Sequence, residues 1–226
     1  MKRMWIATFF ILGNSLFAEA DFERLNMEAG QAAEAKNFVT AEAKYAEALA
    51  SASDSKTKTQ AILGKFKAMR GQKRIKEAEE FLLSRVEDPD IQLQDARQLL
   101  NTLAETMLWQ KGREDCAMGI LQQAQNCECP KSGNVFYQTF YIMAILYRNR
   151  AQYSAEIVVL ENVLQVREQH PANLCTAHYM TGAAYEKLGN SEEALAHYRT
   201  ALKFGKRVKY KYDYTKVEKA IERMCK

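Results

Sequence analysis

Small and aromatic residues recur at helical spacing between residues 177 and 202. The regularly spaced positions are Gly182, Tyr185, Gly189, Ala194, Tyr198 and Ala201. Steps of three or four residues place side chains on one face of an α-helix, and a glycine between two such segments is typical of a tight turn. This stretch therefore predicts two short helices joined at Gly189.

The end of the chain shows a second helical pattern. Four apolar residues form one stripe with charged residues between them: Val217, Ala220, Ile221 and Met224. Three alternating tyrosines precede it, at Tyr210, Tyr212 and Tyr214. The stripe predicts an amphipathic closing helix, and we expect the tyrosines to form a linker packed on the preceding helices.

The helix-turn-helix pattern recurs at four earlier places. The position that opens the second helix of each copy falls at Ala41, Ala78, Ala117, Glu156 and Ala194, in steps of 37, 39, 39 and 38 residues. The residue there is small in every copy except the fourth. Other packing positions are Tyr45, Ala48 and Tyr147. In the second copy we align Leu63 and Gly64 with the first helix, which requires a turn lengthened by about two residues around Gly71.

Prolines provide a check on this register. Pro89, Pro130 and Pro171 fall where the second helix of a copy is expected to end. Proline cannot continue a helix and is common just beyond its C-terminus. Their positions support the proposed spacing.

The pattern resembles the tetratricopeptide repeat, which pairs glycine and aromatic residues in this way. The resemblance implies an all-α, right-handed α-solenoid of about five helix-turn-helix repeats with a C-terminal capping helix. The repeat domain would cover residues 21–226, with repeats at 22–55, 56–94, 95–133, 134–172 and 173–206 and the cap at 208–226. The usual period is about 34 residues, so these repeats have longer helices or turns, and Glu156 departs from the small-residue rule.

Composition agrees with a helical, soluble chain. Only 3 prolines and 10 glycines occur in 226 residues, and 47% of the residues are hydrophobic. Without Lys2, Arg3 and Glu19, the 32 basic and 28 acidic residues become 30 and 27, a net charge of +3. Nucleic-acid binding needs a concentrated basic surface, so we expect no nucleic-acid partner.

The N-terminus has the order of a secretory signal peptide. Lys2 and Arg3 precede an apolar run at 5–17, and Ala18 and Ala20 are small. This order predicts a signal peptide over residues 1–20, cleaved after Ala20, and a bacterial, periplasmic protein. The alternative is an uncleaved anchor, although the run is short of the roughly 20 residues that span a membrane.

Five cysteines leave the disulfide pattern open. Cys116 and Cys127 lie about 16 Å apart if they share one helix, too far for a disulfide. We expect Cys127 or Cys129 to pair with Cys175. The alternative function for Cys127 and Cys129 is thiol-redox exchange in the envelope, but a helix C-terminus disfavours thiolate.

Other candidate chemistry is sparse. The only histidines are His170, His178 and His197. We expect His170 to lie at a helix end that favours a cation, and His178 and His197 to pack within one repeat. The sequence has no phosphate-binding glycine loop, helical zinc-protease motif or nucleophile elbow. We therefore expect no metal, no cofactor and no enzymatic activity.

Basic residues gather near the C-terminus, at Lys203, Lys206, Arg207, Lys209, Lys211, Lys216 and Lys219. One reading is weak contact with an acidic partner or an anionic membrane surface. The other is a solvated face, because Asp213, Glu218 and Glu222 interrupt the cluster.

The resemblance also implies a concave groove, lined by the first helix of each repeat, that receives a peptide or helix of another protein. Transferred by register, the groove residues are Lys65, Thr102, Trp109, Tyr141, Arg148, Asn149, Tyr179, Glu186 and Lys187. Tyr, Trp and Arg often anchor interfaces, although the aromatic residues could equally fill helix junctions. The expected function is a protein-binding scaffold whose partner and oligomeric state the sequence leaves open; end-to-end stacking is a further alternative.

Overall fold

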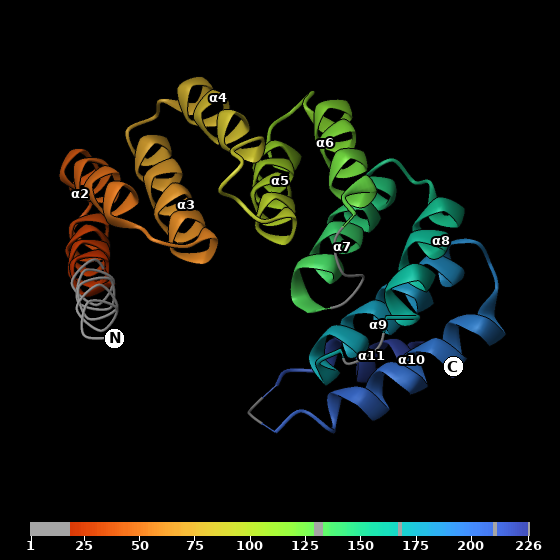
Figure 1. Ribbon diagram of the computed structural model, residues 1–226. Helices are drawn as coiled ribbons and strands as arrows, with labels where there is room; N and C mark the ends of the chain where they lie inside the picture. The colour runs from red at the N-terminus through yellow and green to blue at the C-terminus, as the bar shows by residue number, and fades with distance from the viewer. Residues whose placement is uncertain (1–18, 129–132, 167–168, 210–211, 226) are drawn as a thin grey trace, which may run out of the picture. The chain divides into compact units, whose positions relative to one another are not determined.

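A computed structural model describes residues 19–128, 133–166, 169–209 and 212–225 (Figure 1). Within these ranges every regular element is a helix. The expected signal peptide lies outside them except for residues 19 and 20, which begin a helical segment at 19–34. None of the helices described is both long enough and apolar enough to cross a membrane.

The chain divides into two compact units, residues 1–103 and 104–226. The first unit holds segment 19–34, α2 (Phe38–Ser51), α3 (Ser55–Gly71), α4 (Ile75–Val86) and the beginning of α5 (Leu93–Leu108). A core of Phe22, Leu25, Ala48 and Ala61 joins the first two helices to α3.

The second unit continues with α6 (Glu114–Asn126), α7 (Gly133–Asn149), α8 (Tyr153–Leu164), α9 (Pro171–Lys187), α10 (Ser191–Gly205) and α11 (Thr215–Met224). Helix α7 packs on α8, α8 on α9, and α9 on α10, with α11 against α10 (Figure 1). Two helices fall in each of the five expected repeat ranges, apart from a few terminal residues, and α11 falls in the expected cap.

One residue with positive φ marks the turn of every repeat. These residues are Lys36, Lys73, Gly112, Ala151 and Gly189, with φ of 58°, 64°, 79°, 55° and 82°. Each lies five positions before the residue at which we aligned the second helices, and those five residues are all fully buried. The same turn therefore recurs in each repeat, although only two of the five residues are glycine.

This register corrects the alignment of two repeats. Helix α3 ends at Gly71, two residues before Lys73, as in the first, fourth and fifth repeats. The longer turn instead follows α5, which ends at Leu108, four residues before Gly112. The prediction of a lengthened turn around Gly71 was wrong because Lys73, rather than a glycine, adopts the left-handed conformation.

Close helix contacts explain the small residues. A Cβ on Gly182 would lie 2.9 Å from the Tyr198 ring and 3.0 Å from the Ala194 carbonyl oxygen. Burial extends to the other small packing residues, Ala48 and Ala201. Tyr45 of α2 lies against Gly64 of α3 and so joins two neighbouring repeats. Tyr198 of α10 lies against Gly182 of α9, the other helix of its own repeat.

Half-buried tyrosines complete the packing set. Tyr185 lies beside the His197 ring, with centroids 5.5 Å apart, and packs against the cluster of Ala194, Tyr198 and Ala220 that joins α10 to α11. Tyr147 of α7 is also half-buried. The linker residues Tyr212 and Tyr214 contact the buried cluster of α9–α11.

One proline agrees with the expectation and another differs from it. Pro89 follows the end of α4 by three residues, but Pro171 is the first residue of α9 rather than a stop after α8. Proline suits this position because its missing N–H would have no helical acceptor there. His170 is consequently an N-cap, and its Nδ1 accepts a hydrogen bond of 3.2 Å from the Ala172 N–H, so the expected cation at a helix C-terminus was wrong. Pro130 lies outside the described residues.

Candidate functional site

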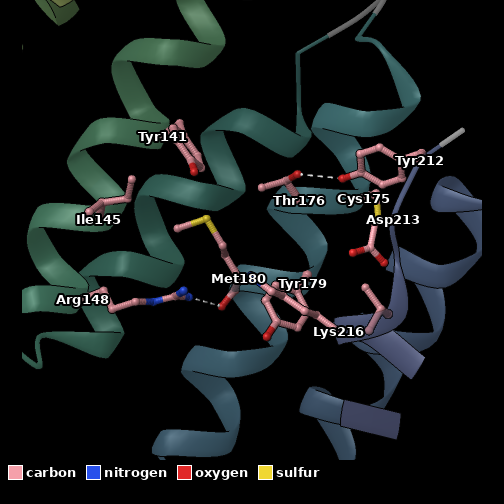
Figure 2. A pocket seen from close by; sticks show the side chains of 11 residues that line it. Tyr141, Ile145, Arg148, Cys175, Thr176, Tyr179, Met180, Tyr212, Asp213 and Lys216 are labelled. Carbon is pink, nitrogen blue, oxygen red and sulfur yellow. Dashed lines mark hydrogen bonds between the residues drawn. The ribbon is translucent and has the colours of Figure 1, made fainter. Parts of the chain in front are cut away.

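A pocket of about 350 Å³ opens in the second unit between α7, α9 and the segment leading into α11 (Figure 2). Its walls combine aromatic, aliphatic and charged side chains. They are Tyr141, Ile145, Arg148, Cys175, Thr176, Tyr179, Met180, Tyr212, Asp213, Lys216 and Val217. Its volume and its mixture of apolar walls with a few polar groups are typical of binding sites.

The pocket follows the repeat register. Tyr141 and Tyr179 each lie ten residues before the left-handed residue of their turn, and Arg148 lies three residues before its own. The sequence prediction thus named three residues that the structure brings together. Ile145 and Thr176 lie on the same helix faces and could have been found from the same spacing. Met180 lacks such a signal. The four residues from Tyr212 onward lie outside the repeats, Tyr212 and Asp213 in the linker and Lys216 and Val217 in α11.

Arg148 is held in place by a buried carboxylate. Its Nη2 forms an ion pair with Glu156 of α8 and donates a hydrogen bond of 2.9 Å to the Met180 carbonyl of α9 (Figure 2). Burial raises the pKa of Glu156, and Arg148 opposes that rise. Glu156, which replaces the small residue found at this position in the other repeats, therefore holds the Arg148 guanidinium at the pocket wall.

Aromatic contacts support the other walls. The Tyr137 and Tyr141 rings stack with centroids 5.6 Å apart, and Tyr179 lies 5.7 Å from the Tyr198 ring. Thr176 Oγ1 and the Tyr212 hydroxyl form a hydrogen bond of 3.2 Å (Figure 2). These contacts limit the freedom of the side chains before any ligand binds, which lowers the entropic cost of association.

Solved structures resemble this chain, whereas no protein-family model and no curated protein matches its sequence. BtubC (BKLC) from P. vanneervenii matches with a TM-score of 0.68 and 18% identity, over 92% of this chain and 89% of that chain. MamA MSR-1 C2 matches with a TM-score of 0.51 and 16% identity, over 82% and 97%. The chain has the all-α fold of tetratricopeptide-repeat proteins. At these identities the likeness shows the fold alone.

The other predicted groove residues of the second unit do not line the pocket. Asn149 and Lys187 are exposed at the ends of α7 and α9. Trp109 is 74% exposed in the turn after α5. Glu186 is engaged by the cap through Arg223, at 2.8 Å.

Two predicted groove residues lie in the first unit. Thr102 is half-buried, and its hydroxyl donates to the Gln98 carbonyl. Lys65 places its Nζ 4.8 Å from the centroid of the Phe81 ring of α4, so it faces the second helix of its own tetratricopeptide repeat. In the turn-based register, Lys67 takes the exposed place that we had assigned to Lys65.

The expected disulfide is not formed. Cys175 is a free, buried thiol, and its Sγ lies 3.2 Å from the point where a Cβ on Gly205 would stand. Burial raises the pKa of the Cys175 thiol. The pairing was wrong because this residue faces α10 and the cap within the last tetratricopeptide repeat. Cys127 caps the C-terminus of α6, and Cys129 lies outside the described residues.

Two histidines meet within the last repeat, as expected. The Nδ1 atoms of His178 and His197 lie 3.1 Å apart, and the His178 ring stacks on Phe204. Burial, with a smaller contribution from His197, lowers the pKa of His178 to about 4. Among the described residues, no group of three or more His, Cys, Asp or Glu side chains is arranged to hold a metal ion.

Proposed function

We propose that this protein is a non-enzymatic protein-interaction scaffold of the bacterial cell envelope. The observation that carries the proposal is the pocket between α7, α9 and α11, which is built on a tetratricopeptide fold. Tyrosine and arginine are the residue types that most often anchor protein interfaces. Tyr141, Tyr179 and Arg148 present both types in one hollow, and a segment of a partner protein would insert there.

The pocket suits binding better than thiol chemistry. Its only thiol is Cys175, and burial raises the pKa of that group. A nucleophilic or redox-active cysteine needs the opposite shift, toward thiolate. Fixed donors and aromatic walls, by contrast, favour a peptide whose backbone and side chains both require partners.

Site-specific photo-crosslinking tests the pocket. A benzophenone amino acid replaces Tyr141 or Ile145, and the matched control replaces Arg199, which is exposed on α10. We expect the two pocket positions to crosslink to the same segment of one partner and Arg199 to give no such product. Equal crosslinking from all three positions, or pocket products scattered over unrelated proteins, would contradict the proposal.

The envelope location is supported by the order of residues 1–20. A fusion to a reporter enzyme that is active only outside the cytoplasm should be active, and changing Lys2 and Arg3 to Glu should reduce export. N-terminal sequencing of the exported product should begin at Asp21. A full-length product confined to the cytoplasm would overturn this part of the proposal and leave the pocket experiment unaffected.

A further inference from the structure

In one stretch of the first unit, all the charged residues are basic. From residue 55 to residue 76, which covers α3 and the turn after it, the sequence has eight Lys or Arg and no Asp or Glu. The stretches on either side are acidic: 19–54 has eight acidic and three basic residues, and 77–103 has seven and two. Exposed helices usually mix the two signs at spacings of three or four. The segregation therefore concentrates positive charge on one helix.

Part of this charge serves the fold. Lys58 forms an ion pair with Asp90, and Arg74 contacts Glu42 of α2 at 2.7 Å. Lys65 lies over an aromatic ring of α4. These three side chains connect α3 and the turn after it to other parts of the unit, and they account for only part of the basic set.

A second part forms a stripe on the exposed face of α3. Its members are Lys56, Gln60, Leu63, Lys67 and Arg70, all exposed except the half-buried Leu63. At 100° per residue they fall within an arc of about 80°, and the stripe is about 21 Å long. No described carboxylate forms an ion pair with Lys56 or Lys67. Asp54, the N-cap of α3, interacts electrostatically with Lys56. The exposed face of α3 thus offers two lysines, Lys56 and Lys67, that form no ion pair with a described carboxylate.

We infer that this stripe docks an acidic segment of a partner protein. Lys56 and Lys67 provide charge at two places three helical turns apart, and Leu63 provides an apolar contact between them. A chain of five to seven residues in extended form spans about 21 Å. One short acidic segment with an apolar residue near its centre therefore matches the stripe in length, charge and pattern. The site lies in the first unit and is independent of the pocket in the second.

The flanking charge favours a narrow partner over a broad one. The two acidic stretches carry a net charge of −5 each, from eight acidic and three basic residues and from seven and two. A bilayer or a polynucleotide presents anionic charge across a wide surface and would meet these stretches as well. A single acidic segment can follow α3 and avoid them. Charge around the stripe therefore selects against wide anionic partners.

Fluorescence anisotropy with labelled hexaglutamate tests the inference on the full chain. We expect saturable binding that weakens steeply between about 50 and 200 mM salt. The double variant Lys56→Glu with Lys67→Glu should weaken binding about tenfold or more, because it reverses both cations. The matched control reverses Arg199 and Lys203, two exposed residues of α10, and should bind as the unaltered protein does.

Further arms separate the alternatives. Helical circular dichroism should be unchanged in the double variant, since both side chains are exposed. Tyr141→Ala should leave hexaglutamate binding intact, so failure of the pocket and failure of the stripe are distinguishable. No binding of hexaglutamate, or equal loss in the α10 control, would overturn the inference. Tighter, Lys67-dependent binding to vesicles containing phosphatidylglycerol or to single-stranded DNA would overturn it as well.

Discussion

The Tyr198 hydroxyl donates a hydrogen bond of 2.6 Å to the Glu186 carboxylate. The same carboxylate accepts bonds of 3.0 and 2.8 Å from Arg223. Because these residues lie on α10, α9 and α11, one carboxylate connects the last repeat to the cap. Hydrogen bonding from Arg223, above all, lowers the pKa of Glu186.

Removing this hydroxyl should loosen the cap. Tyr198→Phe keeps the ring against Gly182 but deletes the donor, and we expect the free energy of unfolding to fall by about 1 kcal/mol. Chemical denaturation at pH 7 measures the change. Thr200→Val is the control on the same helix, because its exposed hydroxyl bonds only to the Ala196 carbonyl. An equal loss in both variants would contradict a specific role for Glu186.

Much of the fold could be predicted from the sequence because it depends on small residues. Ala41, Ala78, Ala117 and Ala194 are buried where helices meet, and their regular steps revealed the register. The turns were harder to predict, because Lys73 adopts a conformation that usually signals glycine. An error of two residues there moved the predicted groove residue from Lys67 to Lys65.

The pocket was predictable only in part. Tyr141 and Tyr179 follow the repeat spacing, so the sequence could place them on one face. Met180 contributes a backbone carbonyl that no side-chain pattern reveals, and Tyr212 comes from a linker whose path depends on tertiary packing. Glu156 was visible only as an exception, since its function depends on Arg148 one helix earlier.

Glycine substitutions should separate close packing from helix propensity. Gly182→Ala places a methyl group 2.9 Å from the Tyr198 ring and 3.0 Å from a backbone oxygen. We expect a loss of about 1–3 kcal/mol in the free energy of unfolding. Gly119 lies in α6 with nothing within 4 Å of a Cβ, so Gly119→Ala should stabilise by about 0.5–1 kcal/mol. Thermal and urea unfolding compare the two, and a stabilising Gly182→Ala would show that the helices are less closely packed.

The Arg148–Glu156 pair should show strong coupling. Arg148→Met leaves a fully buried carboxylate without its cation, and we expect a loss of about 3 kcal/mol. Arg148→Met combined with Glu156→Ala restores the small residue of the other repeats and should recover most of that loss. A double-mutant cycle measured by urea unfolding checks the coupling. Additive losses would show that the two side chains stabilise the fold independently.

The histidine pair should make the last repeat sensitive to acid. The pKa of His178 is lowered to about 4 and that of His197 is also lowered, both mainly by burial. As the pH falls, these histidines therefore bind protons in the unfolded chain before they do so in the folded chain. Full stability is present above about pH 6.5 and falls as the pH approaches 4.

Screening at these half-exposed rings should limit the acid-induced loss to about 1–2 kcal/mol. His197→Gln removes the neighbouring cation and should raise the pKa of His178, which NMR titration of the ring protons measures directly. Glu161 of α8 acts in the opposite sense on His197, so Glu161→Gln should lower the pKa of His197 further. His170→Gln is the control, because His170 lies at the exposed start of α9. A His178 resonance that titrates near pH 6.5 would contradict the prediction.

The shared turn predicts stabilising glycines at defined places. Ala151 has a φ of 55°, and a non-glycine residue in this region costs about 1–2 kcal/mol through contact of Cβ with the backbone. Ala151→Gly removes that contact, and we expect a net gain of about 0.5–1 kcal/mol after the added freedom of the unfolded chain is subtracted. Gly189→Ala is the reciprocal change at the equivalent turn, where φ is 82° and the space is open, so its expected loss comes from backbone strain alone. Urea unfolding of both variants tests whether the left-handed backbone conformation, rather than the side chain, defines the turn. A lower free energy of unfolding in Ala151→Gly, together with no change in Gly189→Ala, would show that the two turns differ.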